Sequence, residues 1–265
     1  MKKIINIVLA ITLTSLLGGC GIRFGIESRR GSWNTDNSTG SYEKVDISED
    51  MNEISKLDIS ISVSNVKINY YDGSDIKISG NLSKYSKGIK TERKSDKLII
   101  IEESEKTIKV MDNSKSDLTI DVPRSFNGDL DLDLGVGEYE INDLVLNNVD
   151  IENGVGDLTL NEISFNELDL ESGVGNTTLE TSKKTGEISI KGGIGETNVS
   201  LGDINGNLKF EGGVGSARIR VPDNAPINIT SSSGLGDAKI KAKTSGDAKY
   251  TFDLEVGIGD VEVTN

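Results

Sequence analysis

Histidine is absent from this sequence of 265 residues, cysteine occurs once and proline three times. Without histidine the chain cannot build Ser-His-Asp or Cys-His catalytic groups, nor zinc sites that use histidine. The remaining polar chemistry is that of carboxylates, hydroxyls, lysine and arginine, which favours a protein that is not an enzyme and has no metal or cofactor. Because one cysteine cannot form an internal disulfide, the fold must depend on a hydrophobic core.

Glycine, in contrast, is abundant, and so is negative charge. The 30 glycines are about 11% of the chain against a usual ~7%, and the scarcity of proline excludes a collagen-like or disordered composition. Asp and Glu outnumber Lys and Arg by 43 to 29, which gives a net charge of −14. Like charge repels nucleic acid and anionic lipid, so we expect neither as a general partner.

The first 19 residues have the pattern of a signal peptide. Met1-Lys2-Lys3 is positively charged, and the apolar stretch from Ile4 to Leu17 is too short for a membrane span. It ends in Leu17-Gly18-Gly19-Cys20, which resembles the bacterial lipobox and implies cleavage before a lipidated cysteine. We therefore expect residues 1–19 to be removed and Cys20 to carry the lipid. The alternative is an ordinary secretory signal with an incidental cysteine.

Lipidation at Cys20 predicts a mature protein held at the outer side of the cell membrane by a lipid anchor. Two acyl chains suffice for stable anchoring. Cleavage removes Lys2 and Lys3 and no acid, so the mature chain carries −16. Residues 20–53 are largely polar and lack periodicity, which predicts a flexible tether between the lipid and the folded part.

Beyond the tether, apolar and polar residues alternate and a glycine motif repeats. Segments such as Leu57-Asp58-Ile59 predict strands, and no helical spacing of useful length occurs, so we expect an all-β fold. Gly-φ-Gly, where φ is Val, Ile or Leu, then recurs seven times, 19 to 23 residues apart. Its glycines are Gly135 and Gly137, Gly154 and Gly156, Gly173 and Gly175, Gly193 and Gly195, Gly213 and Gly215, Gly234 and Gly236, and Gly257 and Gly259.

The repeats share apolar columns when they are aligned on the first glycine. These columns lie five and three residues before it and six after it, as with Val149, Ile151 and Leu160. Such regularity predicts a single-stranded β-helix or β-solenoid of ~20-residue coils. We assign regular coils to residues 126–265 and degenerate coils, with serines in place of the glycines, to residues 54–125. A separate small β domain is the alternative for the latter.

The fourteen glycines are expected to form a structural corner in each coil. Up to the central φ residue, the positions expected to face inward follow the two-residue period of a strand. The next apolar position lies three residues after φ, which breaks that period. One extra residue therefore enters at the second glycine, as in a β-bulge, where glycine tolerates unusual dihedral angles. The pattern predicts that the φ side chains point inward.

Several segments resemble a known family. The run Leu118-Thr119-Ile120-Asp121-Val122-Pro123, following a lipoprotein signal, resembles the bacterial adhesin-like domain of unknown function that is built from β-strand repeats. Gly257-Ile258-Gly259-Asp260 and the alternating residues after it are similar to the toast-rack repeats of cell-envelope stress proteins. The resemblance covers about residues 54–265. It implies a β-repeat fold and supplies no catalytic residue.

Two acidic columns are candidate contact sites. The residue after each second glycine is polar, beginning with Glu138 and Asp157. With coils about 4.8 Å apart, these side chains either remain solvated and cap corner amides or bind a cation such as Ca²⁺. On the outer face Asp131, Asp150 and Asp169 form another column, which is either a solvated face or a docking face for a cationic partner or a cell-wall polymer.

The sequence therefore predicts a non-enzymatic, surface-exposed lipoprotein. Its rigid β-solenoid would present a binding surface to an envelope or extracellular protein, or to a polysaccharide, that the sequence does not identify. One alternative is an accessory protein of envelope stress or signalling. Another is a carbohydrate-active enzyme that uses Asp150 or Asp169, because paired carboxylates can cleave glycosides. The sequence predicts no oligomeric state.

Overall fold

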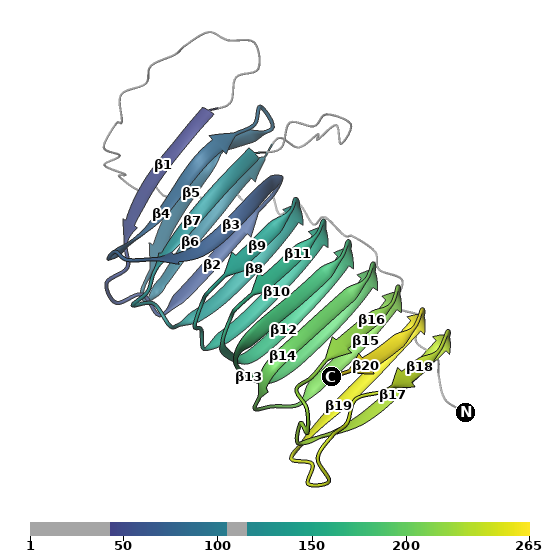
Figure 1. The fold of residues 1–265 in the computed structure, drawn as a ribbon. Helices are drawn as coiled ribbons and strands as arrows, with labels where there is room; N and C mark the ends of the chain where they lie inside the picture. Colours follow the sequence, from purple (N-terminus) through teal and green to yellow (C-terminus); the bar gives the residue numbers. More distant parts are fainter. Residues whose placement is uncertain (1–42, 105–115) are drawn as a thin grey trace, which may run out of the picture. The chain divides into compact units, whose positions relative to one another are not determined.

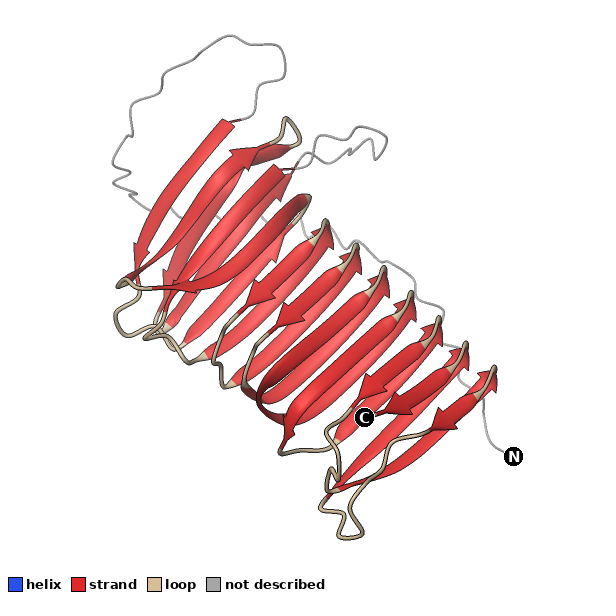
Figure 2. Cartoon of the chain, in the orientation of Figure 1, coloured by secondary structure: helices blue, strands red, loops and turns tan. Residues whose placement is uncertain are grey.

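The computed structural model describes residues 43–104 and 116–265, and these residues form strands, turns and loops without any helix (Figure 2). The all-β prediction is thus confirmed. The signal peptide, Cys20 and the tether up to residue 42 lie outside the described residues. Across the described ranges there is no helix with the length and apolar character needed to span a membrane.

The described residues contain twenty strands, which belong to one sheet. The N-terminal strands are β1 (Glu43–Asp50), β2 (Lys56–Ile61), β3 (Ser64–Tyr71), β4 (Asp75–Leu82), β5 (Ser86–Lys94), β6 (Lys97–Ser104) and β7 (Ser116–Pro123). The strands of the glycine repeats are β8 (Asp129–Val136), β9 (Tyr139–Asn142), β10 (Asn148–Val155), β11 (Leu158–Asn161), β12 (Phe165–Val174), β13 (Thr177–Ile194), β14 (Thr197–Ile204), β15 (Leu208–Val214), β16 (Ala217–Arg220), β17 (Ile227–Leu235), β18 (Ala238–Ile240), β19 (Tyr250–Ile258) and β20 (Val261–Thr264).

The repeat strands form two rows in which neighbours pair in parallel (Figure 1). Strands that precede a glycine bend follow the order β8–β10–β12–β13–β15–β19–β17. Strands that follow a bend are ordered β9–β11–β13–β14–β16–β20–β18. Alternation of side chains places Val149, Ile151 and Leu160 in the core and Asp150 on the outer face. β13 belongs to both rows because it runs from one repeat into the next.

The N-terminal strands extend both rows but also depart from the repeat pattern. β2 pairs in parallel with β6 and β8, and β3 pairs in parallel with β7 and β9. β4 pairs antiparallel with β1 and β7, and β5 pairs antiparallel with β6. Residues 43–50 were assigned to the tether by their polar composition, which was wrong, because β1 obtains backbone partners from β4 and buries Val45.

The bend between β2 and β3 uses a buried carboxylate where the later bends use glycine. Glu102 on β6 is 1% exposed. It accepts hydrogen bonds from the amides of Ser62 and Val63, both at 3.0 Å, and from the hydroxyl of Ser64 at 2.7 Å. A buried carboxylate needs such donors, so this bend depends on a single residue from β6, the strand that pairs with β2.

The last two repeats do not follow the chain order. The seventh repeat (β19 and β20) lies between the fifth and the sixth, so β17 and β18 are the end strands of their rows. The apolar column predicts a buried Ile240, but this residue is 47% exposed. That prediction was wrong because no neighbouring repeat covers β18 on its outer side.

Candidate binding surfaces

The glycine bends place the φ side chains on the outside, and the prediction that they point inward was wrong. In the second repeat, Asn153 pairs with Ser172 and Val155 pairs with Val174, while the glycines between them are skipped. Asn153 is buried, but Val155 is 48% exposed. The chain therefore leaves strand alternation at the first glycine and not at the second. The spacing of the apolar residues could not distinguish a break at the first glycine from a break at the second. Both leave the positions before the first glycine facing the same way.

The glycines are required because successive bends are in backbone contact. Gly156 has a backbone dihedral angle φ of +141°, and a Cβ placed there would lie 1.6 Å from the carbonyl oxygen of Gly137. At the first glycine of the same bend, a Cβ on Gly154 would lie 2.7 Å from the carbonyl oxygen of Gly135. Any side chain at these positions would separate the repeats.

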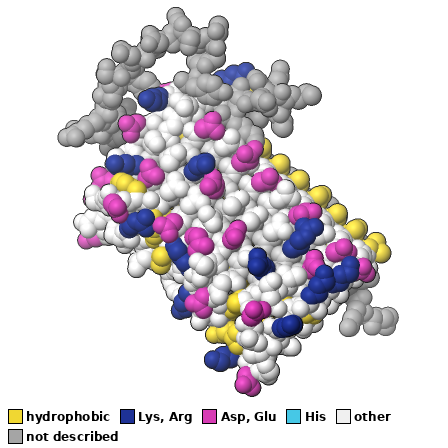
Figure 3. Space-filling view, in the orientation of Figure 1, with side chains coloured by type: hydrophobic (Ala, Val, Ile, Leu, Met, Phe, Trp, Pro, Cys, Tyr) yellow, Lys and Arg dark blue, Asp and Glu magenta, His cyan; other side chains and the backbone are white. Residues whose placement is uncertain are grey.

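The outward φ side chains form a continuous row, partly exposed at Val136 and exposed at the other six positions, which we call the aliphatic ladder. In spatial order it consists of Val136, Val155, Val174, Ile194, Val214, Ile258 and Leu235. The last six of these side chains are 45% to 68% exposed. Figure 3 shows a row of hydrophobic side chains along the edge at which the repeat strands turn. Sequence reasoning identified the column but assigned it to the core, so it missed this surface.

Polar columns flank the ladder on both sides, and ten of their fourteen residues are acidic. The column two residues before the first glycine contains Asp133, Glu152, Glu171, Lys191, Glu211, Glu255 and Ser232. The column three residues after it contains Glu138, Asp157, Asn176, Glu196, Ser216, Asp260 and Asp237. The ladder is therefore an apolar row between two negatively charged rows.

Among the described residues, this negative charge is free of ion pairs at the adjacent first and second repeats, and also at Glu255 and Asp260 of the seventh repeat, which lies between repeats that carry Lys209 and Lys239. Ion pairs at the later repeats join Lys191 to Glu171, Lys209 to Glu211, Arg218 to Glu196 and Lys239 to Asp237. Within residues 43–104 and 116–265, no ion pair involves Asp133, Glu138, Glu152 or Asp157. The negative potential should thus be strongest beside Val136 and Val155.

Several residues of the second flanking column cap the next bend. Asp157 Oδ1 accepts a hydrogen bond from the amide of Asn176 at 2.8 Å, and Asn176 Oδ1 accepts one from the amide of Glu196 at 3.1 Å. These contacts correspond to the capping alternative for this column. Among the described residues, no group of three or more His, Cys, Asp or Glu is placed to hold a metal ion.

The acidic column of the outer face brings together the three aspartates that the sequence singled out. Asp150 pairs with Asp131 on one side and with Asp169 on the other. Partial burial, followed by repulsion from these two carboxylates, raises the pKa of Asp150 above its usual value. Lys56 forms an ion pair of 2.6 Å with Asp131, so the exposed excess of charge lies at Asp150 and Asp169.

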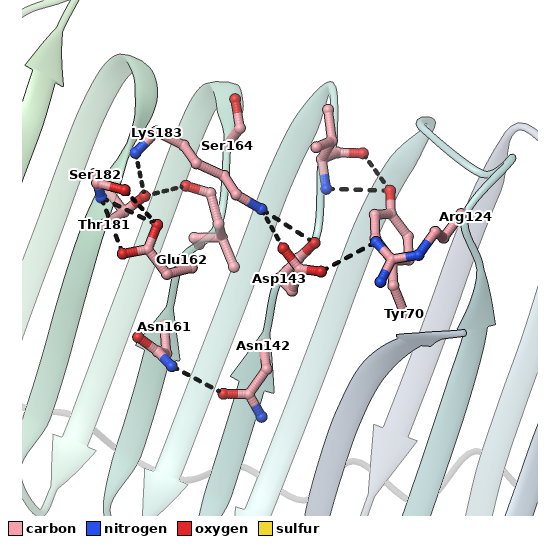
Figure 4. Close-up of polar contacts among 12 residues, drawn as sticks. Tyr70, Arg124, Asn142, Asp143, Asn161, Glu162, Ser164, Thr181, Ser182 and Lys183 are labelled. Carbon is pink, nitrogen blue, oxygen red and sulfur yellow. Dashed lines mark hydrogen bonds and ion pairs between the residues drawn. The ribbon is translucent and has the colours of Figure 1, made fainter. Parts of the chain in front are cut away.

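A polar network on the loops opposite the glycine bends was not predicted (Figure 4). Asp143 has a positive φ of 61°. Its carboxylate lies 2.5 Å from Lys183 Nζ and 3.0 Å from an Arg124 guanidinium nitrogen. These contacts lower the pKa of Asp143, with the Lys183 hydrogen bond as the largest cause. The network joins the loop of the first repeat to that of the third and to Arg124 after β7, and its charges are already paired, which indicates a structural role.

Comparisons with known proteins find one family model and several solved structures that are similar to this chain. Residues 35–180, more than half of the chain, match the family model described as the N-terminal domain of toast_rack, DUF2154. No curated protein matches the chain. Similar solved structures include a "putative adhesin" from Bacteroides fragilis, with 17% identity, 84% of this chain and 98% of that chain covered, and a TM-score of 0.46. Another is a "putative lipid binding protein" from Parabacteroides distasonis, with 16% identity, coverage of 85% and 96%, and a TM-score of 0.44. These values are too low to transfer a function.

Proposed function

We propose that this protein, which belongs to the family of the N-terminal domain of toast_rack (DUF2154), is a non-enzymatic, lipid-anchored binding protein at the outer side of the cell membrane. The acidic column of Asp131, Asp150 and Asp169 carries this proposal. Its carboxylates lie side by side on adjacent strands, and partial burial, followed by repulsion from Asp131 and Asp169, raises the pKa of Asp150. A cationic partner would relieve that repulsion.

A β-solenoid scaffold would suit this role. The parallel register between successive repeats supports that interpretation, because it holds each carboxylate at a regular distance from the next. We propose that the partner is a cationic segment of an envelope or extracellular protein, and a cationic polysaccharide is the alternative. The same surface would serve an accessory of envelope-stress signalling if the partner were a membrane sensor.

Binding of fluorescent poly-lysine to the full-length chain tests the proposal. A variant with Asp150→Lys and Asp169→Lys should bind at least about tenfold more weakly, and the affinity of the wild type should fall with salt. The matched control carries Asp223→Lys and Asp247→Lys, which change the net charge equally at exposed loop positions. Equal loss in both variants would show that net charge alone attracts the probe, and the proposed site would be wrong.

The lipid anchor is proposed from the sequence and has its own test. Cys20 follows a lipobox-like segment, and diacylglyceryl attachment there would keep the protein with the membrane. Wild-type protein expressed in bacteria should incorporate labelled fatty acid and sediment with membranes, whereas Cys20→Ser should do neither. Labelling that persists in the Cys20→Ser variant would contradict the assignment.

The alternative of a carbohydrate-active enzyme would place its catalytic pair at Asp150 and Asp169. A carboxyl group with a raised pKa beside a second carboxylate, as in Asp150 and Asp169, is the combination that glycosidases use. We expect no turnover on a panel of glycans, because a binding face requires none. Hydrolysis that is lost with Asp150→Asn would favour the enzyme over the binding protein.

A further inference from the structure

We infer that the aliphatic ladder is the docking site for an amphipathic helix with lysine or arginine on both sides of an apolar stripe. The inference rests on the proposed function and deepens it, because it names the chemistry of the partner at a surface beside the acidic column. The exposure of the ladder, the hydrogen bonding of the bends and the charge of the flanking columns support it.

The ladder exposes more apolar surface than the bends require. The glycines on either side provide the backbone geometry, so a polar residue between them would also fit. All seven positions are nevertheless Val, Ile or Leu, and Ile194 in the middle of the row is 57% exposed. A continuous exposed apolar surface with a polar rim is typical of an interaction site.

The backbone of the bends favours a helix over an extended peptide. The amides of Gly156, Gly175 and Gly195 donate to carbonyl oxygens of the next repeat at 2.8 Å, 2.9 Å and 2.9 Å. A peptide that adds as a strand needs free backbone groups on its partner, and these amides are already used. A helix satisfies its own backbone and needs only side-chain contacts.

The spacing of the ladder also suits a helix. Neighbouring ladder side chains stand on strands about 4.8 Å apart, and one helical turn rises about 5.4 Å. Seven positions span roughly 29 Å, which is the length of a helix of about 19 residues. Apolar residues at every third or fourth position of such a helix would lie between successive ladder side chains.

Charge determines which partner fits. The acidic columns, unneutralised at Asp133, Glu138, Glu152 and Asp157 within the part of the chain that the structure describes, would face the residues beside the apolar stripe of the helix. Lysine and arginine there form complementary pairs. The same columns would repel an anionic membrane. The acidic columns of two copies would also repel each other if the two ladders met face to face.

Two synthetic peptides of 19 residues and identical leucine and lysine content test this assignment on the full-length chain. In the first, the leucines form one helical stripe between lysines, and in the second the order is scrambled. We expect the first to bind in a fluorescence anisotropy titration and to gain helicity by circular dichroism. We expect the scrambled peptide to bind at least about tenfold more weakly than the amphipathic peptide.

Variants locate the binding site. Val155→Ser combined with Val174→Ser should weaken binding of the amphipathic peptide about tenfold or more, because both side chains would lie in the contact. Val145→Ser is the matched control, since Val145 is 45% exposed but lies outside the ladder. A second variant, Glu138→Lys with Glu152→Lys, should also weaken binding and serves if the serine variant fails to fold.

Other outcomes would overturn the inference. Equal binding of both peptides, or unchanged binding by the serine variant, would exclude the ladder. Ladder-dependent binding to phosphatidylglycerol vesicles without peptide binding would indicate a membrane contact, and ladder-dependent self-association without peptide binding would indicate a second copy. If poly-lysine binding still depends on Asp150 and Asp169 while the ladder variants bind the peptide normally, the proposed function stands and only this inference fails.

Discussion

Val214 on β15 pairs directly with Ile258 on β19, although a complete repeat separates them in the sequence. The intervening repeat places Leu235 on the far side of Ile258, at the end of the ladder, where it is 68% exposed. The sixth repeat therefore closes the row, and the seventh is covered on both sides. An end repeat needs less apolar surface than an internal one.

A substitution at a bend glycine tests the contact between repeats. Gly195 has a φ of +149°, and a Cβ there would lie 1.8 Å from the carbonyl oxygen of Gly175. We expect Gly195→Val to lower the free energy of unfolding by at least about 2 kcal/mol, measured by urea and thermal unfolding. Gly246→Val is the control, because a Cβ at Gly246 meets nothing within 4 Å. Similar loss in both variants would refute the bend geometry.

The composition of the repeats could have indicated that the seventh repeat lies between the fifth and the sixth. In the sixth repeat two inward positions are Ser231 and Ser233, whereas the seventh has Leu254 and Val256 at the same positions. Serines suit an uncovered end and aliphatic residues suit the interior. The period, the strands and the parallel pairing of equivalent residues were predictable from the columns. The order of the repeats depends on which faces remain uncovered, which a period does not encode.

Glu102 provides a second test of stability. Glu102→Ala would remove the acceptor of the buried Val63 amide, the part-buried Ser62 amide and the Ser64 hydroxyl. Because unsatisfied buried donors are costly, we expect a loss of more than about 2 kcal/mol in the free energy of unfolding. The neighbouring Glu103 is partly exposed and forms an ion pair of 2.6 Å with Lys90, so Glu103→Ala should cost less than about 1 kcal/mol. An equal effect of both substitutions would argue against the buried contact.

The pH dependence of stability tests the acidic column. A raised pKa means that the folded chain binds the Asp150 proton more tightly than the unfolded chain does, so stability falls as pH rises through that pKa. Asp150→Asn removes this loss and should stabilise the protein at neutral pH by about 0.2 to 1 kcal/mol.

Melting curves at neutral pH and at about pH 3 check this expectation, since the difference between Asp150→Asn and the wild type should vanish when the carboxyl is protonated. Asp223→Asn serves as the control, because Asp223 lies in a loop outside the acidic column. Destabilisation by Asp150→Asn at neutral pH would mean that the aspartates of the column do not repel one another.

The candidate sites were predictable to different degrees. Asp131, Asp150 and Asp169 share a column in the structure as they do in the aligned sequence, because strand alternation extends to their positions. The ladder was missed because the chain leaves that alternation at the first glycine. The Asp143 network was missed because it joins variable loops, whose pairing no period describes.

A methyl-resolved NMR titration of the full-length chain with the amphipathic leucine and lysine peptide shows whether a helix docks on the aliphatic ladder. We expect shifts at the methyl groups of Val136, Val155 and Val174, and none at the exposed Val145 and Ile101 outside the ladder. Shifts of equal size at Val145 and Ile101, or none at the ladder, would contradict that expectation.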